Sequence, residues 1–67
     1  MSVARVSKIT AASSTGFDDA VRTGLERASK TLHGITGLHV LEHKAKVEQG
    51  RIAEYRVTME VTFVLEE

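Results

Sequence analysis

The clearest pattern in the sequence is an alternation of apolar and polar residues near its C-terminal end. Every second residue from Ala53 to Leu65 is apolar, and mostly polar residues stand between them. A period of two places the apolar side chains on one face of an extended strand. The pattern therefore predicts a strand with one face in the core and one face of mixed polarity.

The preceding residues predict a partner for this strand. Leu38–Glu48 has the composition of a second strand, and Gln49-Gly50 is typical of a two-residue hairpin turn in which Gly supplies a positive φ. Two adjacent antiparallel strands are therefore expected.

The turn also sets a register for the hairpin. On the core face it predicts these pairs: Val40 with Met59, Leu38 with Val61, and Lys44 with Tyr55. On the other face it places His39 opposite Glu60 and His43 opposite Arg56, with Leu41 and Thr58 beside them. A slip of one residue would bury charge and expose Val40, so this register is favoured.

A helix is predicted upstream of the hairpin. Its apolar stripe, at steps of three and four, is formed by Phe17, Val21, Leu25, Ala28 and Leu32. Candidate N-caps are Ser13, Ser14 and Thr15, followed by Asp18 and Asp19 in the first turn. Lys30 and His33 would lie in the last turn, with Gly34 as the residue that ends the helix. Before the helix, Val3–Thr10 predicts a first strand and Ala11–Gly16 a loop.

The lengths of these elements do not match. A strand from Ile52 to Leu65 would extend ~45 Å, at ~3.3 Å per residue. A helix from Phe17 to Leu32 would cover only ~24 Å, at ~1.5 Å per residue. Part of the apolar face, at the end near Ala53 and Tyr55, therefore needs another cover, and a neighbouring subunit is the simplest one.

Composition points the same way. The chain of 67 residues is expected to form a single domain, residues 1–67, and it contains no Cys that could form a disulfide. Domains of this size bury only ~60% of the surface that the unfolded chain exposes, so assembly is the remaining common source of stability.

Nine basic and nine acidic residues leave no basic surplus of the kind that nucleic-acid binders carry. No apolar run approaches the ~20 residues of a membrane span, and no secretory signal is visible. We expect a cytoplasmic protein without a nucleic-acid or membrane partner.

The order of elements resembles that of the dodecin family. The resemblance covers essentially the whole chain, and most of it lies in the helix segment Gly24 to Leu32 (GLERASKTL) and the last strand Tyr55 to Glu67 (YRVTMEVTFVLEE). It implies an α+β fold, with a β-α-β-β protomer whose three-stranded antiparallel sheet is wrapped around one helix. It also implies a hollow homododecamer, which agrees with the cover that the long strand needs.

The resemblance also implies a ligand site. Many dodecins bind flavins (riboflavin, FMN or FAD), stacked in pairs between Trp side chains of subunits related by two-fold axes. The position of that Trp is Gly37 here, a Gln that bonds the flavin ring is replaced by Arg56, and an Arg of the second strand by Lys44. The chain has no Trp at all, Arg cannot accept a hydrogen bond, and each aromatic stack adds roughly 0.5–1.5 kcal/mol. We therefore expect a small-ligand binding or storage particle in which flavin binding is weakened or lost.

Other interpretations of these residues stay open. Gly37 and Arg56 could belong to a plain subunit interface, with Arg56 paired to an acid. Some family members without the Trp are linked to metal ions, including calcium, so the alternative is a structural or ion-binding shell with no flavin role. Lys44 and Lys46 could meet a phosphate-bearing ligand or lie over an apolar interface, to which Tyr55 would belong.

Metal binding and catalysis find little support within one chain. His39 and His43 would lie ~13 Å apart on a strand, too far to share an ion, and His39 is expected to pair with Glu60 instead. The acidic residues have no EF-hand spacing, so a cation would need carboxylates that meet on a three-fold axis. No nucleophile motif, phosphate loop or metal-protease motif is present, and the chain is not expected to be an enzyme.

Overall fold

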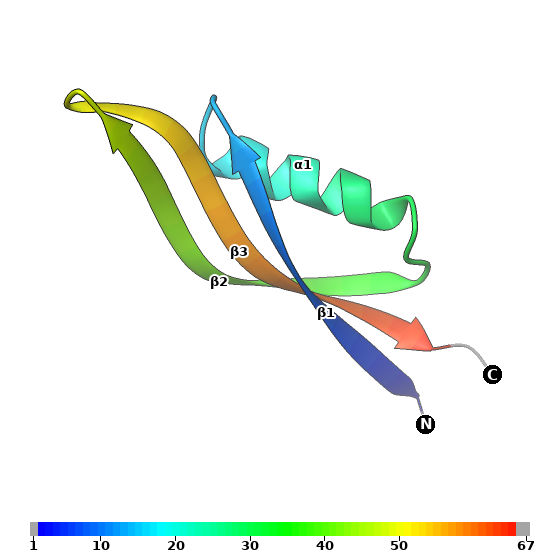
Figure 1. Ribbon diagram of the computed structural model, residues 1–67. Helices are drawn as coiled ribbons and strands as arrows, with labels where there is room; N and C mark the ends of the chain where they lie inside the picture. Colours follow the sequence, from blue (N-terminus) through cyan, green and yellow to red (C-terminus); the bar gives the residue numbers. More distant parts are fainter. Residues whose placement is uncertain (1, 66–67) are drawn as a thin grey trace.

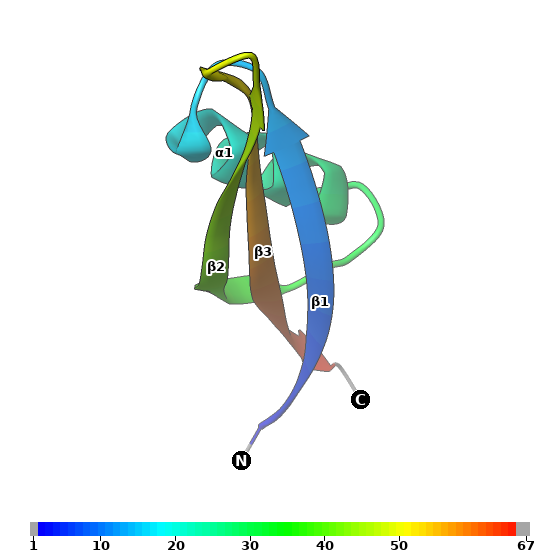
Figure 2. The ribbon, with the colours of Figure 1, turned by 60° about the vertical axis from the view of Figure 1, so that its left-hand side comes forward.

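The computed structural model describes residues 2–65 (Figure 1). Its elements follow the order β1 (Val3–Ser13), α1 (Phe17–Ser29), β2 (Ile35–Glu48) and β3 (Arg51–Leu65). The three strands of this described part form one antiparallel sheet in the order β1-β3-β2, and α1 lies along one face of it (Figures 1 and 2). The predicted β-α-β-β fold with a three-stranded antiparallel sheet and one helix is confirmed.

The hairpin turn is the one that the sequence predicts. Gln49 and Gly50 both have positive φ, 52° and 74°, as a tight two-residue turn with the natural twist of the strands requires. The pairs next to the turn and those around Val40 keep the predicted register, so that Val40 lies opposite Met59, and Leu38 opposite Val61.

The middle of the hairpin departs from the prediction. One irregularity in β2 leaves Leu41 without a partner, and a second leaves Ala53 of β3 without one. Between them the register moves by one residue, so that Lys44 lies opposite Arg56 and not opposite Tyr55. His43, expected beside Arg56, lies opposite the buried Val57. A regular strand would place Val40 and Lys44 on the same face, because they are four residues apart. The β-bulge at Leu41 keeps Val40 in the core and turns the charged Lys44 to the opposite face.

The helix packs on the sheet through its small residues. Its buried positions are Ala20, Gly24 and Ala28, at steps of four, and not the larger residues of the predicted stripe. Ala20 contacts the fully buried Val57 and Met59 of β3. Phe17 and Val21 pack beside this contact, as the stripe predicts, and Leu25 is only partly buried. Small side chains on one line let the helix approach the sheet closely.

The helix also ends earlier than predicted. It stops at Ser29, and Lys30, Thr31 and Leu32 form a turn whose N–H groups bond to the carbonyls of residues 27 and 28. Ser29 donates its hydroxyl to the carbonyl of Leu25, a side-chain bond that competes with regular helix. Gly34, with φ 75°, lies in the loop to β2, and its carbonyl accepts the N–H of Val64.

The start of the helix also differs from the prediction of a Ser or Thr N-cap. The N-cap is Gly16, and none of the three predicted hydroxyl residues caps the helix. Residues 11–13, expected in a loop, extend β1 along β3. Ser13 is buried and joins the strand to the helix, since its Oγ donates to Asp19 Oδ2 (2.7 Å) and accepts the N–H of Thr15 (2.9 Å).

The sheet extends beyond its helix at both ends. The protomer measures 51 × 19 × 13 Å, whereas the 13 residues of α1 span only ~20 Å. Val47 and Ile52 near the hairpin turn are 62% and 52% exposed, and Val3 and Leu65 at the opposite end are also exposed. The exposed apolar residues near the turn agree with the prediction, whereas those at the opposite end of the sheet were not predicted.

The protomer is also less compact than a typical monomer of its size. The surface is 5097 Å², against about 4,200 Å² for a compact monomer of this mass. The radius of gyration is 13.8 Å, against about 11 Å for a compact chain of this length. Within residues 2–65 no helix is long and apolar enough to cross a membrane.

Candidate ligand site on the helix-free face of the sheet

The candidate residues lie on the face of the sheet that α1 does not cover, here called the helix-free face. Val57, Met59 and Val61 of β3 point to the helix, so the residues between them point to the opposite face. Their cross-strand partners in β2 share that face: Gly37 with Thr62, His39 with Glu60, Glu42 with Thr58, Lys44 with Arg56, and Lys46 with Glu54.

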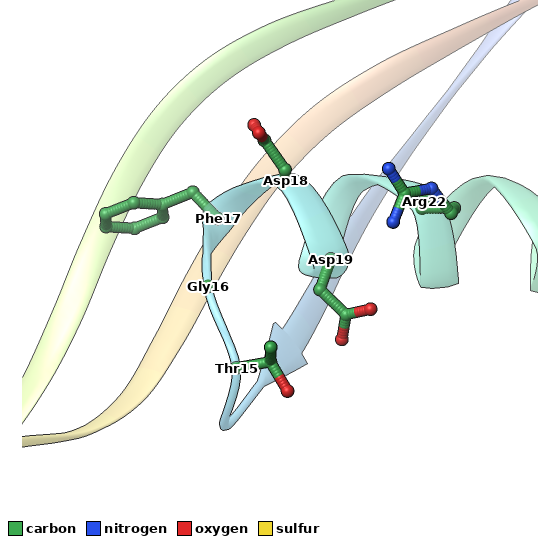
Figure 3. A pocket seen from close by; sticks show the side chains of 6 residues that line it. All are labelled: Thr15, Gly16, Phe17, Asp18, Asp19 and Arg22. Carbon is green, nitrogen blue, oxygen red and sulfur yellow. The ribbon is translucent and has the colours of Figure 1, made fainter.

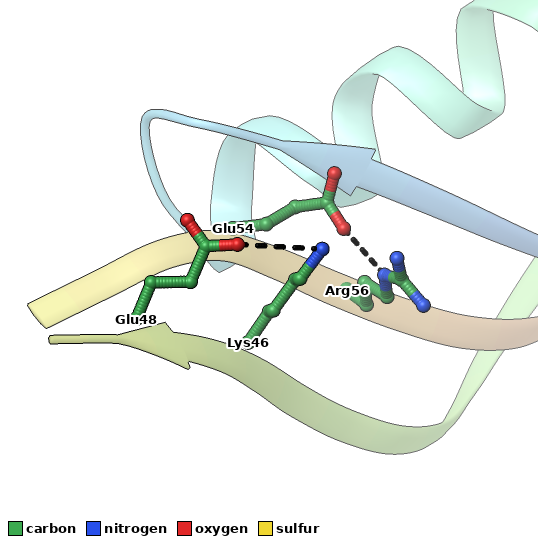
Figure 4. A network of polar contacts seen from close by, with 4 residues as sticks. All are labelled: Lys46, Glu48, Glu54 and Arg56. Carbon is green, nitrogen blue, oxygen red and sulfur yellow. Dashed lines mark hydrogen bonds and ion pairs between the residues drawn. The ribbon is translucent and has the colours of Figure 1, made fainter.

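Two of the three candidate positions are neighbours. Lys44 and Arg56 lie directly opposite each other, where Cβ atoms are about 4.5–5.5 Å apart. Arg56 donates its Nε–H to Glu54 of the same strand (Figure 4), so the expectation that Arg56 pairs with an acid is confirmed. Lys46 lies 3.6 Å from Glu48, measured from Nζ to Oε2. Among residues 2–65, Lys44 forms no ion pair within 4.0 Å.

Gly37 lies apart from this pair. Its partner Thr62 is six residues from Arg56 along β3, or roughly 20 Å. A Cβ atom added at Gly37 would meet only the Cβ of Thr62, at 3.9 Å, which is an ordinary contact. Crowding therefore does not require glycine here, and the position has room for a larger side chain.

Two hollows in the described part of the protomer lie elsewhere. One surrounds the start of α1 and is lined by Thr15, Gly16, Phe17, Asp18, Asp19 and Arg22 (Figure 3). A second lies between the end of α1 and the end of β3, with His33 and Phe63 in its wall. Neither of these two hollows includes Gly37, Lys44 or Arg56.

The two histidines of the hairpin have different surroundings. His39 lies 3.7 Å from Glu60, between Nδ1 and Oε1, which confirms the predicted pairing. His43 faces the helix side, and its ring meets that of Phe17 edge to face at 4.9 Å between centroids. The ring of Tyr55 also meets that of Phe17 edge to face, at 5.1 Å between centroids. This aromatic cluster of Phe17, His43 and Tyr55 packs the start of α1 against the hairpin, where the helix begins to cover the sheet.

Within residues 2–65, no group of three or more His, Asp or Glu side chains is close enough to hold a metal ion. The two histidines are separated by the sheet, since they point to opposite faces. A metal centre in this part of the chain would need ligands from several copies.

The fold and the exposed apolar residues at both ends of its sheet define a class of small α+β proteins in which one helix covers only part of a longer sheet. The chain belongs to the dodecin family, a family of flavin-binding homododecamers, because the family model described as Dodecin matches residues 3–66.

Individual relatives support the same family assignment. The dodecin of Thermus thermophilus is 36% identical over 55 residues, which cover 82% of this chain and 80% of that protein. The solved dodecin of Streptomyces davaonensis is 41% identical, with a TM-score of 0.93, over 98% of this chain and 97% of that one. A calcium dodecin of Mycobacterium tuberculosis, described as calcium-chelating with a novel calcium-binding site, is 26% identical, with a TM-score of 0.83, over 96% and 91% of the two chains.

The residues present do not fit a stacked flavin of the family's kind. Gly37 offers no ring, and a Cβ atom added there would have only the Cβ of Thr62 within 4 Å. Arg56 offers only donors, and one of them is already bonded to Glu54.

Proposed function

We propose that this chain forms a hollow homododecamer that binds or stores a small ligand, with flavin binding weakened or lost. The observation that carries the proposal is the length of the sheet relative to its helix. Apolar side chains at both ends, among them Val47, Ile52, Val3 and Leu65, have no cover within the protomer. Exposed apolar residues gathered at the ends of a sheet in this way suit an interface with other copies.

Sedimentation velocity at low protein concentration tests the assembly. We expect one species of about twelve times the 7.3 kDa subunit mass. A folded, stable monomer across the concentration range would contradict the proposal, since the bare apolar ends would then tolerate water.

The altered ligand site is tested by titration with riboflavin and FMN under the same conditions. Gly37 removes the outer wall of the stack, and Arg56 removes an acceptor, so we expect little quenching of flavin fluorescence at micromolar protein. Micromolar or tighter binding with strong quenching would show that other residues hold the ring.

The alternative is a shell that binds calcium and has no flavin role. The similarity to the calcium dodecin of Mycobacterium tuberculosis favours it. Because the described residues of one protomer hold no metal group, the carboxylates would have to come from several copies. Elemental analysis of the assembled protein after dialysis against calcium separates the two: about one calcium or more per three chains supports the ion-binding shell, and a trace amount argues against it.

We also propose that the protein is not an enzyme. Support comes from the sequence, which contains no nucleophile, phosphate-loop or metal-protease motif. Release of a product from a screened ester or phosphate substrate, scaling with protein concentration, would contradict this.

A further inference from the structure

We draw no further inference here: the strongest candidate, the apolar hollow between the end of α1 and the end of β3 that Leu32, Phe63 and Leu65 line, carries none because nothing in the structure shows what covers it.

Discussion

Replacement of Gly24 by alanine tests how closely the helix approaches the sheet. Gly24 is buried at the centre of the small-residue line of α1. In an isolated helix the change would stabilise, since Ala is better than Gly by up to about 1 kcal/mol. In this fold the added Cβ would lie 2.3 Å from the terminal methyl of Met59 and 3.0 Å from the Cβ of Ala11.

These two contacts decide whether Gly24→Ala stabilises or destabilises the protein. The methyl of Met59 ends a flexible side chain and can move, but Met59 is fully buried and has only other core atoms around it. The Cβ of Ala11 is fixed to β1, so the helix must shift outward by a few tenths of an ångström. Overpacking of this kind costs about 1–3 kcal/mol. We therefore expect Gly24→Ala to destabilise the protein by about 1 kcal/mol net, despite the gain in helix propensity.

Urea unfolding at a fixed protein concentration measures this change, since the proposed assembly would make stability depend on concentration. Thr23→Ala, on the exposed side of the same helix, is the control and should be neutral or slightly stabilising. Met59→Leu removes the clashing methyl, so the double variant with Gly24→Ala should lose less than the sum of the single changes. If Gly24→Ala raised the stability by the full propensity difference, the close approach of the helix would be refuted.

Three further changes test other parts of the structure. Ser13→Ala should destabilise by about 1 kcal/mol in urea unfolding, because it removes the part-buried hydrogen bonds to Asp19 and to the N–H of Thr15, whereas Ser14→Ala at an exposed position should be near neutral. Val47→Asp should lower the assembled fraction in sedimentation, while Gln49→Asp, with the same charge in the turn, should not; equal effects would exclude an apolar contact at this end. Gly37→Trp should strengthen riboflavin binding at least tenfold by fluorescence quenching, and Gly37→Leu should not; no gain would mean that the missing ring does not limit binding.

The strict alternation of β3 was enough to predict that strand, its core face and the hairpin turn. Its period is regular, and Gly50 occupies a turn position that favours glycine. The bulge at Leu41 could not be predicted, because β2 lacks a clean alternation and its two local registers differ only in which side chains lie against the helix.

This limit carried over to the candidate site. Gly37 and Arg56 were predicted correctly on one face, but Lys44 was predicted on the core face opposite Tyr55, and so its adjacency to Arg56 was missed. The buried side of the helix was also missed in part, since an Ala-Gly-Ala line at steps of four contributes little hydrophobicity. Its step of four was nevertheless present in the sequence as a signal for close helix packing.

The short helix has a consequence for how the protein responds to its environment. In the proposed assembly, a protomer whose buried apolar centre is small would rely on its neighbours for much of the burial that keeps it folded. Folding and association then become one equilibrium, and the amount of protein present enters its stability directly. Dilution of the proposed assembly should therefore lower the folded fraction, as heating does.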